Sequence, residues 1–197
     1  MKVNSSIGQT TDFSKKSYFY STPESLNPKL QHLFDLLEAD RHKLLEKADE
    51  LSTEQFNRAR PGKWSLNQIL AHLIAAEEMS LAYMNKKIPG IRDAGETGVW
   101  EELKMVALKG SQRLPFKFKA PRAVIENTPS YSNLEQLKSH WDNERAELKR
   151  FLENFNDDQL RKKIYRHIRA GRLNIQHALI FFREHYLHHW PQIKRLL

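Results

Sequence analysis

Two histidines near the end of the chain have the spacing of a metal-binding pair. His185 and His189 lie four residues apart, and residues four apart stack on one face of a helix, about one turn of ~5.4 Å along its axis. Both fall on an apolar stripe with helical spacing, which consists of Ala178, Phe182, His185, His189, Ile193 and Leu196. An unpaired polar group in a core is unfavourable, so these imidazoles need a partner. A metal ion is one candidate partner.

A third histidine, His72, occupies the apolar stripe of an earlier helix, between Ile69 and Ala76. Three imidazoles from two helices would form a three-histidine site with an open coordination position, as catalytic zinc sites have. The chain has no cysteine, so any metal is held by histidine, carboxylate and water. We expect zinc or nickel, with iron and manganese left open. The alternative is three hydrogen-bonded core histidines without a metal.

Two charged residues also interrupt apolar stripes, namely Glu144 and Arg41. We predict Glu144 as a catalytic residue, either a hydrogen-bond partner of a ligand histidine or a general base beside the open position. The alternative is a buried ion pair between Arg41 and Glu144. Three further histidines near the C-terminal end are expected at the surface of the protein or at its boundary with the core. They are His167, His177 and His188.

Composition restricts the class of protein. A chain of 197 residues with 40% hydrophobic content fits one domain with a real core. No apolar run is long enough to span a membrane, and the polar N-terminal stretch does not resemble a signal peptide, so we expect a cytoplasmic protein. The net charge is +8, and the excess falls within 161–197. A basic end attracts anions, nucleic acid included, but no DNA-binding motif accompanies it, and we do not expect nucleic acid as the partner.

The elements that must position these residues read as helices. Apolar residues recur with helical spacing in four segments, about 28–51, 65–87, 133–155 and 174–196, with a possible short helix over 99–109. The pattern predicts an all-α four-helix bundle over 28–197, preceded by a polar arm over 1–27. The long connection over 88–132 between the second and third helices is expected to be a crossover, and its Trp100 a lid or dimer contact.

These motifs resemble the DinB/YfiT-like family. In that family a Trp-Ser pair opens the second helix and a His-Leu pair supplies the first metal ligand, as in residues 63–77, KWSLNQILAHLIAAE. The last helix of the family carries a His-x-x-x-His pair, often with a doubled second histidine and a trailing Gln-Ile, as in residues 185–193, HYLHHWPQI. The resemblance covers about residues 28–197 in helix order.

The resemblance implies a divalent metal on His72, His185 and His189, a homodimer, and similarity to S-transferases that use low-molecular-weight thiols such as bacillithiol or mycothiol. A metal-dependent isomerase is another relative of the family. The first hypothesis is a metal-dependent enzyme that acts on small molecules by thiol-dependent S-transfer or hydrolase-type chemistry, and whether the chain is an enzyme at all stays open. The alternatives are a non-enzymatic metal- or ligand-binding bundle, such as an oligomeric stress protein, and a basic nucleic-acid-associated protein.

Overall fold

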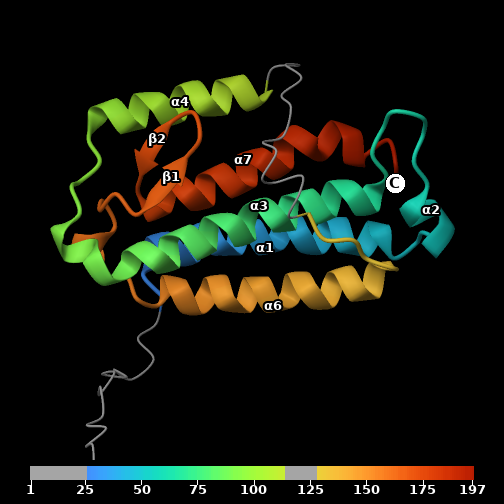
Figure 1. Ribbon diagram of the computed structural model, residues 1–197, viewed down its shortest axis with the longest axis horizontal. Helices are drawn as coiled ribbons and strands as arrows, with labels where there is room; N and C mark the ends of the chain where they lie inside the picture. The colour runs from blue at the N-terminus through green and yellow to red at the C-terminus, as the bar shows by residue number, and fades with distance from the viewer. Residues whose placement is uncertain (1–25, 114–127) are drawn as a thin grey trace, which may run out of the picture.

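The protein is a helical bundle in the computed structural model, which describes residues 26–113 and 128–197 (Figure 1). Its four long helices are α1 (Pro28–Ala48), α3 (Leu66–Lys87), α6 (Leu134–Leu152) and α7 (Ile175–Ile193). Helices α1 and α7 run in one direction and α3 and α6 in the other, so the connection from α3 to α6 returns along the length of the bundle (Figure 1). The predicted all-α bundle is confirmed.

Shorter elements complete the chain. They are α2 (Thr53–Asn57), the 3-10 turns η1 (Ile88–Asp93) and η2 (Asp157–Gln159), α4 (Val99–Arg113), and the strands β1 (Tyr165–His167) and β2 (Gly171–Leu173). Helix α4 lies along the outer side of α7 (Figure 1). The hairpin of β1 and β2, which pairs Tyr165 with Leu173 in antiparallel register, was not predicted. Residues 1–25 of the predicted arm and 114–127 of the predicted crossover lie outside the described residues.

Side-chain caps fix where the two histidine-bearing helices begin. Ser65 caps α3: its hydroxyl accepts a hydrogen bond from the Gln68 amide at 3.2 Å, and the Gln68 side chain accepts one from the Ser65 amide at 2.9 Å. Asn174 caps α7 and accepts from the His177 amide at 2.9 Å. Capping of this kind satisfies amides that have no partner inside the helix. The caps therefore set the first turns from which the histidines are counted.

The core consists of two apolar clusters with a charged layer between them. One cluster contains Leu37, Leu81 and Leu148, and the other contains Leu44, Ile74 and Trp141, together with further residues of each helix. Between these positions in the sequence lie three buried charged residues, which are Arg41 of α1, Glu77 of α3 and Arg145 of α6. Within the described residues, no helix is long and apolar enough to cross a membrane.

Candidate metal centre

The three predicted histidines converge at the interface of α3 and α7. His72 on α3 is 5% exposed and His189 on α7 is 8% exposed, while His185 is half-buried. The Nε2 atoms of His72 and His185 are 3.2 Å apart, and one nitrogen from each histidine lies within 4.8 Å of the other two. Among the described residues, no other group of three or more histidine or acidic side chains has ligand atoms within 4.8 Å of one another.

Burial keeps these imidazoles neutral. Desolvation, with smaller contributions from His189 and His188, lowers the pKa of His72 to about 4. Desolvation also lowers the pKa of His189 to about 4, against a hydrogen bond from its ring to Gln192, and that of His185 well below its usual value. A neutral imidazole is the form that binds a metal ion. All three rings therefore have the required protonation state at neutral pH.

One separation between ligand nitrogens matches that of a tetrahedral site. With metal–nitrogen bonds of about 2.0–2.1 Å, two ligand nitrogens of a tetrahedral site lie roughly 3.3 Å apart, close to the separation of 3.2 Å between His72 and His185. In the alternative of three hydrogen-bonded core histidines, one of the two facing Nε2 atoms carries a proton and donates it to the other. Among the described residues, Nδ1 of His72 is buried without a hydrogen-bond partner in either arrangement. The donor set fits a divalent metal.

Gln192 was not predicted to act on the site. Its Oε1 lies 3.0 Å from Nδ1 of His189, so it accepts a hydrogen bond when that nitrogen is protonated. Nε2 of His189 is then unprotonated and available as a ligand. Side chains that orient a ligand imidazole in this way commonly support metal sites. The spacing of three residues between His189 and Gln192 on one helix is the sequence signal that could have revealed this contact.

Aromatic rings line the centre on two sides. Trp64, 37% exposed, lies with its ring centroid 5.1 Å from His72 and is stacked on His189 at 6.5 Å. On the other side Phe181 stacks on His185 at 5.4 Å, and His167 of β1 contacts Phe181 edge-on at 4.5 Å. Trp64 therefore forms part of the solvent-facing edge of the site, rather than packing in the core as Trp141 does.

A family model described as the DinB superfamily matches residues 36–193. This range contains all three histidines. The chain belongs to the DinB superfamily. A search of curated proteins finds no match, and a search of solved structures also finds none. Membership in the DinB superfamily agrees with the observed all-α fold.

Glu144 lies on α6 of this DinB-superfamily bundle, where its neighbours are other acidic groups. Burial raises the pKa of Glu144 to about 7, with further contributions from Glu78 and Glu77. No contact among the described residues joins Glu144 to the three histidines. Its role as a general base or as a partner of a ligand histidine stays a prediction.

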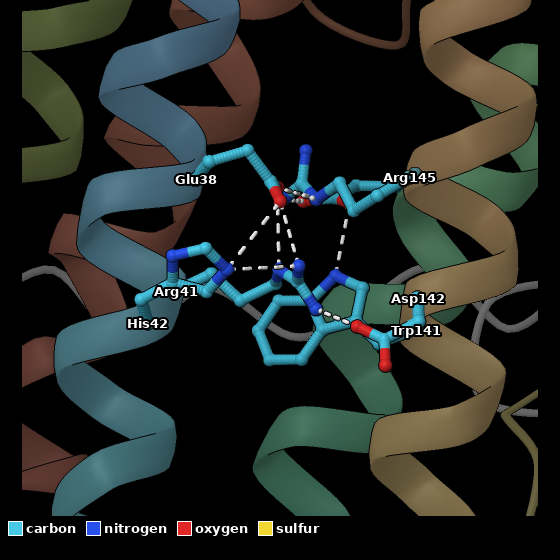
Figure 2. Close-up of polar contacts among 7 residues, drawn as sticks. Glu38, Arg41, His42, Trp141, Asp142 and Arg145 are labelled. Carbon is cyan, nitrogen blue, oxygen red and sulfur yellow. Dashed lines mark hydrogen bonds and ion pairs between the residues drawn. The ribbon is translucent and has the colours of Figure 1, made fainter.

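The buried charge of α6 is Arg145, 4% exposed, whereas Glu144 is half-buried. Arg145 donates to Glu77 at 3.0 Å, and its Nε lies 3.2 Å from Glu38. Figure 2 shows the group, in which Arg41 pairs with Glu38 and Asp142 and lies beside Trp141. The alternative of an Arg41–Glu144 pair is therefore wrong: the partner of Arg41 on α6 is Asp142.

Two histidines expected at the surface or its boundary are buried instead. His167 is 7% exposed, and its Nδ1 accepts hydrogen bonds from the amides of Arg169 and Ala170 in the hairpin turn. His177 is 3% exposed, and its Nε2 lies 3.0 Å from Glu102 of α4. The expectation fails because His167 belongs to a hairpin that was not predicted, and because α4 packs over His177.

Acid is expected to destabilise the metal-free protein through the buried histidines. Their folded-state pKa values of about 4 lie below the ordinary value of about 6.5, so the unfolded chain binds more protons between these pH values. The stability that His72 and His189 contribute is present above pH 6.5 and is lost as the pH falls toward 4, by up to about 3 kcal/mol for each. Urea denaturation of metal-free protein from pH 7.5 to 4.5 measures this. A free energy of unfolding independent of pH would contradict it.

The substitution Glu144→Gln is expected to stabilise the protein above pH 7 and to change little near pH 4.5. The raised pKa of Glu144 means that the folded state binds the extra proton between pH 4.5 and 7, so this carboxyl destabilises the fold as the pH rises through 7. Glutamine has the shape of the protonated form and carries no charge. Denaturation of both proteins at the two pH values measures the difference, and equal effects at both would contradict the explanation.

Proposed function

We propose that this chain is a divalent-metal-dependent enzyme that acts on small molecules, with zinc or nickel held by His72, His185 and His189. The observation that supports this most strongly is the convergence of three neutral imidazoles within 4.8 Å. When bound, such an ion supplies Lewis acidity, which lowers the pKa of a thiol or of water. Three protein ligands leave a coordination position open for a substrate.

The residues around the centre support a low-molecular-weight thiol as co-substrate. Phe181 and Trp64 stack on two of the imidazoles and form apolar walls beside them. The basic excess within 161–197 would attract the carboxylates that such thiols carry.

The chemistry proposed is S-transfer. In a test with monochlorobimane as the electrophile, the sulfur–carbon bond forms as the carbon–chlorine bond breaks, chloride leaves, and the thiol proton passes to a base and from there to solvent. Glu144 is the candidate group of this chain for accepting a proton, since burial raises its pKa to about 7, and general bases function best with a pKa near the operating pH.

The experiment is a turnover assay of metal-loaded protein with bacillithiol, mycothiol and glutathione, each with monochlorobimane. The expected result is a rate above the uncatalysed reaction that is lost in His72→Ala/His185→Ala and retained in His188→Ala. A metal-loaded wild type without turnover of any thiol contradicts the S-transfer proposal. Hydrolysis of ester or amide probes by that same protein would then favour hydrolase-type chemistry. Inactivity with every probe would favour a non-enzymatic metal-binding bundle.

A further inference from the structure

Helix α4 has apolar residues on two opposite faces. Met105 and Leu108 are 3% and 7% exposed, on the face that packs against α7. On the opposite side, successive residues at about 100° per position form a second apolar face, here called the outer face of α4. Its residues and their exposed fractions are Val99 78%, Trp100 65%, Leu103 54% and Val106 67%. Figure 1 shows α4 at the edge of the molecule.

A contiguous exposed apolar stripe of this kind is typical of an interaction site. We propose that the outer face of α4 binds the same face of a second copy of this chain, with the two helices antiparallel about a two-fold axis near Met105 and Val106. The proposal concerns a surface separate from the histidine centre and does not depend on the proposed function.

The charges beside the outer face are self-complementary in this arrangement. Glu102, 65% exposed, and Lys109 lie on the same flank of α4, seven residues and two turns apart. A two-fold axis midway between them places Glu102 opposite the partner's Lys109 and Lys109 opposite the partner's Glu102. Isologous interfaces require this kind of matching, since the same surface meets itself.

The sizes of the side chains match in the same register. The first half of α4 carries Val99 and the large ring of Trp100, whereas the second half carries Ala107, Gly110 and Ser111. A Cβ added at Gly110 would meet nothing within 4 Å. The antiparallel register places the Trp100 ring of one copy over the small residues of the other, so that a large and a small surface face each other at both ends of the interface.

Other occupants fit the flanks less well. A nucleic acid or an anionic membrane surface would favour positive charges alone beside the apolar face. Helix α4 instead carries the acidic Glu102 together with Lys104 and Lys109. The Lys104 ammonium lies over the Trp100 ring, 5.7 Å from its centroid. This positive charge is therefore held against the outer face of α4. A surface with both signs around an apolar stripe favours a second copy.

The first test is sedimentation equilibrium of the full, untagged chain at up to about 0.5 mM, a concentration that populates even a complex with a Kd near 100 µM. The wild type is expected to dimerise, and Leu103→Glu and Val106→Glu to shift the Kd upward by at least tenfold. Ile168→Glu is the matched control, because Ile168 is 75% exposed on the hairpin and its substitution is expected to leave the Kd unchanged. A wild type that stays monomeric overturns the proposal.

Charge exchange tests the register without removing apolar surface. Lys109→Glu alone is expected to weaken dimerisation, and the double variant Glu102→Lys/Lys109→Glu to restore it. Circular dichroism confirms folding of each variant, since Glu102 also contacts His177. A double variant as weak as Lys109→Glu overturns the antiparallel register.

Single cysteines give a second, independent measure, because the chain has none of its own. Residue 106 lies near the proposed axis, so Val106→Cys is expected to form a disulfide with its counterpart under mild oxidation. Two copies of residue 99 would be about 20 Å apart along the antiparallel helices, beyond the Cα separation of roughly 4.4–6.8 Å that a disulfide allows. Cross-linking of Val99→Cys in preference to Val106→Cys overturns the proposed geometry.

Discussion

Arg145→Ala is expected to lower the free energy of unfolding by about 3–5 kcal/mol. Arg145 is 4% exposed and donates to Glu77, itself 5% exposed, at 3.0 Å. Removing one member of a buried ion pair leaves the other as an uncompensated charge, and such losses typically cost this much. Burial already raises the pKa of Glu77, which Arg145 opposes, so Glu77 is expected to take up a proton in the variant. Urea denaturation at pH 7 measures the change.

Two companion variants identify the cause of that loss. The double variant Glu77→Gln/Arg145→Met removes both charges and is expected to be much less destabilised than the sum of the two single variants. Arg150→Ala removes an exposed arginine from a surface pair with Glu147 and is expected to change the stability by less than about 1 kcal/mol. Additive effects in the double variant would show that Arg145 and Glu77 do not act as a pair.

A divalent metal is expected to stabilise the fold by about 4 kcal/mol when its free concentration is a thousand times its Kd. A ligand that binds the folded chain and not the unfolded one has this effect by mass action, and the three histidines come together only when α3 and α7 are packed. Denaturation with added zinc or nickel, compared with a chelator, measures it. The stabilisation is expected to disappear in His189→Ala, which removes a ligand.

His188→Ala is the matched control for the metal effect. His188 is the neighbour of His189 on the same helix and is half-buried, but it is not a member of the converging group. The variant is expected to keep the full metal stabilisation. Equal loss in both variants would mean that the ion binds the histidine-rich helix in some other way than at the three-histidine centre.

The four long helices and the histidine triad could be predicted because helical periodicity carries both. Helix α3 was predicted over 65–87 and is observed at Leu66–Lys87. His72, His185 and His189 interrupt otherwise aliphatic stripes, so the pattern that predicts the core also predicts the polar residues inside it.

The rotation of α6 could not be predicted, and this is why Arg145 was missed. From Trp141 the apolar stripe can continue to Leu148 through residue 144 or through residue 145, since spacings of three and four both fit a helix. The choice depends on which neighbours the helix packs against, and here the buried Glu77 of α3 selects Arg145. A single helix contains no information about that partner.

The hairpin was missed for a related reason. Its strands have three residues each, and their alternation amounts to one exposed arginine between two less exposed residues in each strand, which is too short for a period of two to be recognised. In the turn, the amides of Arg169 and Ala170 donate hydrogen bonds to Nδ1 of His167. Gly171 has a positive φ of 77°, which glycine adopts readily. The burial of His167 follows from this local structure.

The metal content of the purified, untagged protein tests the three-histidine centre most directly, when elemental analysis compares it with the variant His72→Ala/His185→Ala. We expect close to one zinc or nickel ion for each wild-type chain and none in the variant. If the wild type contains no metal and takes up none when it is offered, the centre is not a metal site, and the three converging imidazoles are hydrogen-bonded core residues.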